Sequence, residues 1–122
     1  MTDTKLKVWG WTLSLDLKNC NQNVRDSEVI EEFGHELVKA IDMIEYGSPD
    51  IIHFGKDDKA GWTWLQMLTT SNCCAHFCDS GDGYIDIFTC KEFKPSIAVE
   101  VIDKYFAPQH MSVHFRERGV PI

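Results

Sequence analysis

The sequence has no long apolar run and no secretory leader, and each absence excludes a class of protein. A membrane-spanning helix needs about 20 consecutive apolar residues, and no stretch of the 122-residue chain approaches that length. The N-terminus, MTDTKLKVWG, lacks the apolar segment of a signal peptide. We therefore expect no membrane association and a cytoplasmic location.

Basic residues are too few and too scattered for a nucleic-acid-binding protein. The chain has 12 Lys and Arg residues against 19 Asp and Glu residues, which gives a formal net charge of −7. Proteins that bind the phosphate backbone gain affinity from clustered Lys and Arg, which displace counterions. The sequence therefore predicts no nucleic-acid partner.

The cysteines form neither a disulfide framework nor a standard zinc motif. Five cysteines make an odd set without a secretion signal, which favours free thiols. The segment CCAHFC invites a zinc site, because Cys74, His76 and Cys78 would share one face of a strand. Same-face neighbours lie roughly 7 Å apart, however, and no C-x-x-C pair completes a tetrahedral site. We expect no metal, and a metal-binding protein remains only as a third alternative.

The overall composition is that of one globular domain. Hydrophobic residues make up 43% of the chain and charged residues 25%, both within the usual range for folded proteins. A chain of this length matches the commonest size of a single hydrophobic core. We expect one domain over residues 1–122, with one site that a second copy of the chain could complete.

Two apolar periods alternate along the chain and predict a mixed fold. Residues 8–17 alternate, with Leu13, Leu15 and Leu17 on one face, as in a half-buried strand. Apolar residues then recur every three or four positions from Val29 to Ile44, which predicts an amphipathic helix. Asp26 or Ser27 can cap this helix, and GSPD at positions 47–50 would end it.

The rest of the chain is predicted to form short strands and one more helix. We expect strands over residues 51–54, 61–68, 73–78, 84–90 and 109–116, and a second helix that begins at Pro95. The short links in the middle force antiparallel neighbours. The sequence therefore predicts an α+β fold: a two-layer sandwich, with an antiparallel sheet and two helices packed on one face.

Three reactive side chains fall on this sheet at suggestive positions. Ser71 lies in a turn, His76 follows five residues later on the outgoing strand, and Cys90 ends the next strand. In an antiparallel meander Cys90 returns beside the Ser71 end, so that a nucleophile, a base and a thiol could converge. Each residue alone has an ordinary interpretation, as a turn serine, an interior histidine or a buried thiol. Their joint spacing favours catalysis.

The stretch TSNCCAHFCDSGDGYIDIFTC, residues 70–90, resembles the processing and active-site hairpin of the bacterial S-adenosylmethionine decarboxylases. In that family a Ser-His pair opens the hairpin, a second His lies five residues after the Ser, and the strand closes on Asp-x-Phe-Thr-Cys. Those positions are Ser71, His76 and residues 86–90 here. The segments GWTLSLDLKNC, GWTWLQMLTTS and YFAPQHMSVHFRERG resemble the family's first strand, pre-cleavage strand and closing helix and strand. Thr63, eight residues before Ser71, falls where the family has a hydroxyl residue important for processing.

The resemblance implies a self-made pyruvoyl cofactor. The hydroxyl of Ser71 would attack the carbonyl of Thr70, and elimination would cleave the chain between Thr70 and Ser71 and leave the pyruvoyl group at residue 71. His76 would accept the α-proton of that elimination, and Thr63 would hydrogen-bond the intermediate. The new ketone would form a Schiff base with S-adenosylmethionine and act as an electron sink during decarboxylation. Cys90 would then return a proton to the α-carbon.

The resemblance also implies a homodimer with shared sites and a role in spermidine and other polyamine biosynthesis. Its substrate carries a sulfonium cation and a flat adenine, which suit an acidic protein with aromatic faces in its cleft. Phe54, in the loop before the processing strand, is the candidate to stack on adenine. Asp79 is the candidate for the ribose hydroxyls, with Asp82 as an alternative.

Several positions depart from the family pattern. The residue before the cleavage serine is usually Glu and here is Thr70, and the residue after it is usually His and here is Asn72. The family's His-Thr-Trp-Pro-Glu becomes HFCDS at 76–80, without the Glu that binds ribose. Two alternatives therefore stay open. One is a relative that decarboxylates another amino acid, such as arginine or ornithine, and the other is an unprocessed, inactive homologue that serves as a binding or regulatory subunit.

Overall fold

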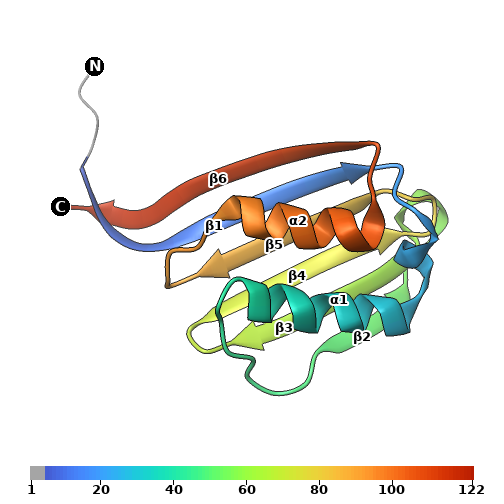
Figure 1. The fold of residues 1–122 in the computed structure, drawn as a ribbon, viewed down its shortest axis with the longest axis horizontal. Helices are drawn as coiled ribbons and strands as arrows, with labels where there is room; N and C mark the ends of the chain where they lie inside the picture. Colours follow the sequence, from blue (N-terminus) through green and yellow to red (C-terminus); the bar gives the residue numbers. More distant parts are fainter. Residues whose placement is uncertain (1–4) are drawn as a thin grey trace.

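The computed structural model describes residues 5–122, which form a six-stranded antiparallel sheet and two α-helices (Figure 1). The strands are β1 (Leu6–Lys18), β2 (Asp50–Phe54), β3 (Gly61–Leu68), β4 (Ser71–Cys78), β5 (Gly83–Thr89) and β6 (His110–Pro121). The helices are α1 (Ser27–Ala40) and α2 (Pro95–Phe106), with short 3-10 turns η1 (Gln22–Arg25) and η2 (Asp57–Lys59). Neither α-helix of this described part is long and apolar enough to cross a membrane.

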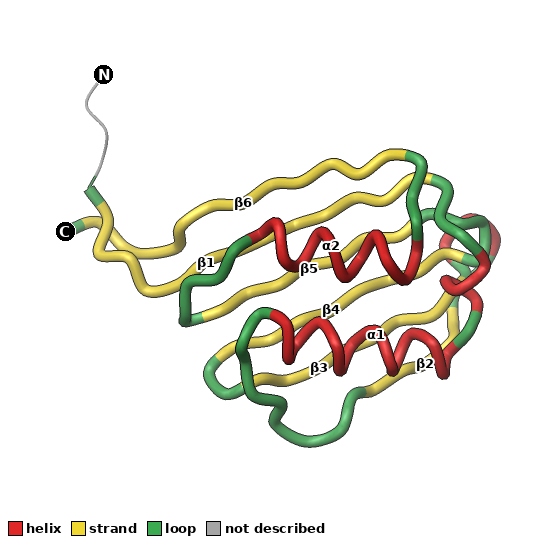
Figure 2. Tube along the Cα trace, viewed as in Figure 1, coloured by secondary structure: helices red, strands yellow, loops and turns green. Residues whose placement is uncertain are grey.

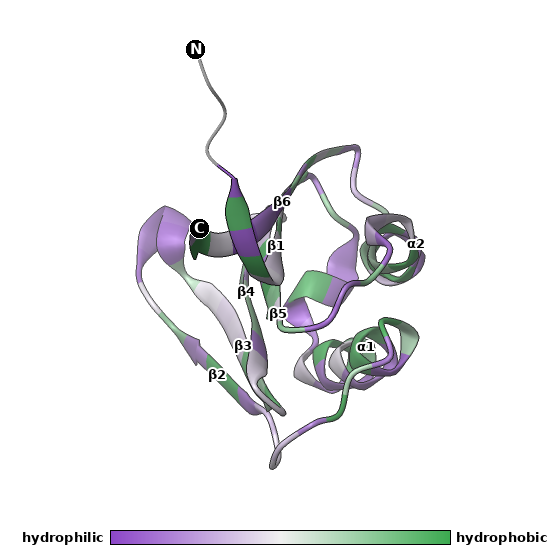
Figure 3. Ribbon diagram, turned by 90° about the vertical axis from the view of Figure 1, so that its left-hand side faces the viewer, coloured by the Kyte–Doolittle hydropathy of each residue, from purple (hydrophilic) through white to green (hydrophobic). Residues whose placement is uncertain are grey.

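The strand order across the sheet is β2-β3-β4-β5-β1-β6, which makes β2 and β6 the two edges. Both helices run along one face of the sheet, as Figure 2 shows. The end view in Figure 3 shows the sheet curving around the two helices, and no described element covers its other face. We call this other face the open face. The predicted two-layer α+β fold is confirmed.

The core lies between the sheet and the helices, as the alternation of the first strand predicts. Leu13, Leu15 and Leu17 of β1 point toward the helices and are buried. Large aromatic side chains fill the centre, where Phe33 of α1 contacts the rings of Trp64 and Phe77. Burying side chains of this size supplies most of the free energy that holds two such layers together.

Helix α1 begins as the sequence predicts and ends earlier. The carboxylate of Asp26 accepts hydrogen bonds from the backbone N–H groups of Glu28 and Val29, at 3.0 and 3.3 Å, and so caps the first turn. The helix ends at Ala40, because Asp42 takes a left-handed backbone conformation with φ of 59° that turns the chain away. The prediction that Ile44 belongs to the apolar face of this helix is therefore wrong, and its side chain is 70% exposed.

The second half of the chain follows the predicted order of elements. Helix α2 begins at Pro95, which needs no backbone N–H donor there. The last strand is longer than predicted and pairs with β1 along nearly its full length. A register shift between Val8 and Gly10 of β1 interrupts this pairing near the end of the edge strand.

Candidate active site

Two hairpin connections bring Thr70, Ser71 and Cys90 together at one end of the sheet. Ser71 opens β4 opposite Leu68, and the pairing of β4 with β5 carries Cys90 back beside it. The backbone N–H of Cys90 donates a hydrogen bond to Ser71 Oγ at 2.9 Å. Thr70 Oγ1 lies 2.7 Å from Cys90 Sγ. We call these three residues the cleavage cluster.

The backbone of Thr70 is strained. Its φ of 57° lies in the left-handed region, which β-branched residues rarely adopt. Such strain costs on the order of 1–3 kcal/mol and is found disproportionately at functional sites. The strained residue is the one whose carbonyl Ser71 is predicted to attack. Ser71 itself is almost buried, with 8% of its surface exposed.

The pKa of the Cys90 thiol is lowered, whereas the pKa of each of the other four cysteines is raised. Hydrogen bonds with the hydroxyls of Thr70 and then Ser71 hold the pKa of the Cys90 thiol below its usual value, against a smaller opposing effect of burial. Burial instead raises the pKa of Cys73 to about 12 and that of Cys20 to about 11. Cys90 is therefore the thiol with the most accessible thiolate form among these three.

Thr63 and His76 form a second group on the open face. They are directly opposite each other on β3 and β4, and Thr63 Oγ1 lies 2.9 Å from His76 Nδ1. His76 Nε2 donates to the carbonyl of Lys59 at 2.8 Å. Because a carbonyl can only accept, the neutral ring carries its proton on Nε2, and Thr63 donates to Nδ1. Nδ1 is thus the basic nitrogen of this histidine.

Phe54 lies beside this pair at the end of the edge strand β2. Its ring centroid is 6.4 Å from that of His76, and its side chain is 56% exposed. We call Thr63, His76 and Phe54 the histidine cluster. The predicted aromatic candidate is therefore near the predicted base and presents an open ring face.

The two clusters do not meet within one chain. Ser71 and His76 are five residues apart on the same strand, which separates their Cα atoms by roughly 16 Å. An odd separation also points the two side chains to opposite faces of the sheet. Of the three residues expected to converge, the structure brings together Ser71 and Cys90 and leaves His76 at the far end of β4.

Asp79, the candidate for binding ribose, is held by other groups. Its carboxylate lies 2.8 Å from His53 Nε2, and its carbonyl accepts a hydrogen bond from Arg25 Nε at 2.8 Å. Asp82, the alternative, accepts a hydrogen bond from the backbone N–H of Asn19 at 3.0 Å. Of the two carboxylates, only that of Asp82 borders the cavity beside His76.

That cavity has a volume of about 260 Å³ and is bordered by both acidic and aromatic side chains. Its lining residues are Asp58, Lys59, His76, Cys78, Ser80, Asp82 and Tyr84. The sequence did not single out Asp58 or Tyr84. The only signal for Tyr84 was its place on the same strand face as Asp86. A polar residue on that face indicates that the face points away from the core.

A smaller cavity, of about 200 Å³, borders the cleavage cluster. Thr70 and Cys90 line it together with Asp42 and Lys91, whose side chains form an ion pair with each other. Nothing in the sequence pattern indicated this pair, because Asp42 and Lys91 are brought together only by the fold.

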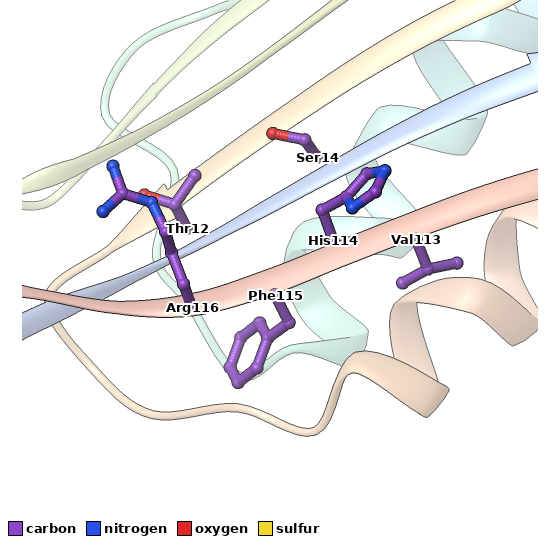
Figure 4. A pocket seen from close by; sticks show the side chains of 6 residues that line it. All are labelled: Thr12, Ser14, Val113, His114, Phe115 and Arg116. Atoms are coloured by element: carbon purple, nitrogen blue, oxygen red, sulfur yellow. The ribbon is translucent and has the colours of Figure 1, made fainter. Parts of the chain in front are cut away.

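Another hollow, of about 410 Å³, lies around the edge strand β6 and contains no residue of either cluster. Figure 4 shows its lining side chains, which come from β1 and β6 and point to both faces of the sheet. Among residues 5–122, no group of three or more His, Cys, Asp or Glu side chains is placed to hold a metal ion.

Comparisons with known proteins identify a family and a shared fold. The family model of S-adenosylmethionine decarboxylase matches residues 11–119, which include both clusters. The crystal structure of the adenosylmethionine decarboxylase from Aquifex aeolicus VF5 has the same fold, with a TM-score of 0.76. That match covers 93% of each chain at 24% sequence identity. No curated protein sequence matches the chain.

Proposed function

The chain belongs to the S-adenosylmethionine decarboxylase family, and we propose that it decarboxylates S-adenosylmethionine after cleaving itself between Thr70 and Ser71. The observation that carries this proposal is the contact between the backbone N–H of Cys90 and Ser71 Oγ, beside the strained Thr70. This contact holds the Ser71 hydroxyl next to the peptide bond that it would attack. It also holds residue 71 next to the Cys90 thiol, which would act in the later decarboxylation.

The chemistry of cleavage fits these groups. Ser71 Oγ would bond to the carbonyl carbon of Thr70 as the C–N bond breaks, and the freed nitrogen would take the hydroxyl proton. A base would then remove the α-proton of residue 71, and the Cβ–Oγ bond would break. Oγ would leave as an oxygen of the new Thr70 carboxylate, and water would replace the nitrogen, which departs as ammonia. The Cys90 N–H already binds the oxygen on which the negative charge would develop.

The residues of the cleavage cluster also suit the second reaction. The pyruvoyl group made at residue 71 would supply a ketone that accepts the electron pair released when carbon dioxide leaves. The first residue of β4 would hold this group at the end of the sheet. Cys90 would stand beside it, and its thiol would deliver a proton to the substrate's α-carbon.

The base would come from a second copy of the chain. His76 is too far from Ser71 in its own chain to remove the α-proton, whereas it lies on the open face, where another copy can reach it. That face exposes several large apolar side chains, and a monomer rarely leaves such a surface uncovered. They are Ile52, Phe54, Leu65, Met67 and Tyr84, each between 44% and 57% exposed. A two-fold dimer would cover both open faces and make two equal sites.

The cavity beside His76 supports a cationic substrate with a flat ring. The carboxylates of Asp58 and Asp82 border it, and Tyr84 and the neighbouring Phe54 offer ring faces. A sulfonium ion is attracted both by carboxylates and by the faces of aromatic rings. The decarboxylated product would be a donor of aminopropyl groups for spermidine synthesis.

Two observations favour a second candidate, an uncleaved homologue that acts as a binding or regulatory subunit. Asn72 follows Ser71 where the family usually has His, and the carboxylate of Asp79 pairs with His53 and does not border the cavity beside His76. Such a homologue would have the same fold and form the same dimer, but it would neither cleave itself nor decarboxylate a substrate.

Release of labelled carbon dioxide separates the candidates. Purified protein would be incubated with carboxyl-labelled S-adenosylmethionine, arginine or ornithine, with the Ser71→Ala variant as the matched control. We expect release from S-adenosylmethionine alone, and none from Ser71→Ala. Release from arginine or ornithine instead would change the substrate, and no release from any of the three would favour the uncleaved subunit.

A further inference from the structure

The hydroxyl of Thr70 contacts the thiol of Cys90, and the reactions described above make no use of this contact. Thr70 Oγ1 lies 2.7 Å from Cys90 Sγ and 2.7 Å from the carbonyl oxygen of Thr69. The single hydroxyl proton of Thr70 can point to either acceptor. The hydroxyl can therefore donate to a Cys90 thiolate, or donate to the Thr69 carbonyl and accept from a Cys90 thiol.

We propose that Thr70 is a positioning residue for the Cys90 thiol, through its hydroxyl in the uncleaved chain and through its new carboxylate after cleavage. The proposal rests on the proposed function for its second half only. Its first half concerns the uncleaved chain and holds whether or not the protein has a substrate.

In the uncleaved chain two hydroxyls favour the thiolate. Hydrogen bonds with Thr70 and then with Ser71 lower the pKa of Cys90. The charged groups that line the same cavity are Lys91 and Asp42, and they form an ion pair with each other. Because each neutralises much of the other's charge, the two hydroxyls remain the main influence on the sulfur.

Cleavage removes one of these two hydroxyls and adds a charge. Ser71 Oγ, which now accepts the Cys90 N–H, becomes an oxygen of the Thr70 carboxylate, so one hydroxyl disappears and one negative charge appears beside the sulfur. A nearby negative charge disfavours the thiolate and raises the pKa of the thiol. The processed protein would therefore keep Cys90 protonated at neutral pH, in the form that can donate a proton to the substrate's α-carbon.

The first test measures alkylation of Cys90 by iodoacetamide as a function of pH, in the Ser71→Ala background that cannot cleave. Mass spectrometry of peptides distinguishes Cys90 from the other four cysteines. Adding Thr70→Val removes the hydroxyl and keeps the β-branched shape. We expect alkylation at pH 7 to slow about tenfold, because less thiolate is present. Adding Thr70→Ser should restore the rate, and Thr70→Ala should repeat the loss if Thr70→Val folds poorly. Unchanged pH profiles in both Val and Ala variants would overturn the first half.

The second test compares the cleaved wild-type protein with uncleaved Ser71→Ala. Both lack the Ser71 hydroxyl, and the new charge that the cleaved protein has beside Cys90 is that of the Thr70 carboxylate. We expect slower alkylation of Cys90 in the cleaved protein at pH 7, with its pH profile moved to higher pH. An equal or lower pH midpoint would overturn the second half. A wild-type chain that never cleaves would overturn the proposed function and the second half together, while the first test would still decide the role of the Thr70 hydroxyl.

Discussion

The backbone N–H of Cys90 donates a hydrogen bond of 2.9 Å to the hydroxyl oxygen of Ser71, 19 positions earlier in the chain. The antiparallel pairing of β4 and β5 creates this contact, since it returns the end of β5 to the start of β4. The proposed nucleophile and the proposed proton donor are thereby held side by side in the uncleaved chain.

Thr63 is predicted to control His76 through a single hydrogen bond. Thr63→Val removes the donor to His76 Nδ1 and keeps the side chain's shape, so the ring is held only by the Nε2 hydrogen bond to the Lys59 carbonyl. We expect cleavage to slow by about tenfold or more, and Thr63→Ser to retain most of the rate. The rate is read from the uncleaved fraction over time on a denaturing gel. Equal rates for the Val and Ser variants would contradict this role.

Mixing two inactive variants tests whether the two clusters meet between chains. A His76→Ala chain keeps its own Ser71 but has no base, and we expect its cleavage to slow about 10²–10⁴-fold. Co-expressed with a Ser71→Ala chain, which supplies an intact His76, the His76→Ala chain should be cleaved again. The matched control is co-expression with a Ser71→Ala, His76→Ala double variant, which should rescue nothing. Absence of rescue by the first partner would contradict a shared site.

Gly34 is predicted to be essential for packing. A methyl group at this helix position would lie 2.5 Å from Trp64 Nε1, which is too close for any real contact. Gly34→Ala should therefore lower the free energy of unfolding by about 1–3 kcal/mol, although the same change in an exposed helix usually stabilises it. Denaturant unfolding measures the difference. A variant as stable as the wild type would contradict the packing described.

His35 should make stability depend on pH. Burial lowers the pKa of His35, but hydrogen bonds and charges from Glu45 and Glu31 outweigh burial and raise it overall. A raised pKa in the folded state stabilises the protein below the pKa of the unfolded state, and this stabilisation is lost as pH rises through the folded value. His35→Gln should therefore destabilise the protein at pH 5 and have no effect at pH 8. The loss at pH 5 should be slight, because the pair of His35 and Glu45 is partly exposed. Thermal melts at the two pH values check this, and an equal loss at both would contradict it.

The sequence predicted the fold well, because the fold depends on periodicity. The alternation of Leu13, Leu15 and Leu17 and the three- and four-residue spacing around Phe33 distinguish strand from helix without knowledge of any contact. The end of α1 was missed because Ile44 continues the apolar spacing beyond the point where Asp42 turns the chain. A left-handed Asp leaves no periodic signal.

The site was only partly predictable. The spacing of Ser71, His76 and Cys90 singled them out as candidates, but it could not give their contacts, which depend on the register between strands. The contact of Thr70 with Cys90 is of this kind, because it needs both the β3–β4 turn and the β4–β5 pairing. The separation of His76 from Ser71 was implicit in their spacing of five positions, because an odd spacing on one strand places two side chains on opposite faces.

Intact mass spectrometry of the purified protein under denaturing conditions tests the central claim most directly. Self-cleavage predicts two fragments that divide between Thr70 and Ser71, with a C-terminal fragment that bears a pyruvoyl group at its start, whereas Ser71→Ala gives one uncleaved mass. A single uncleaved mass for the wild-type protein after long incubation would contradict the account and leave the binding or regulatory role.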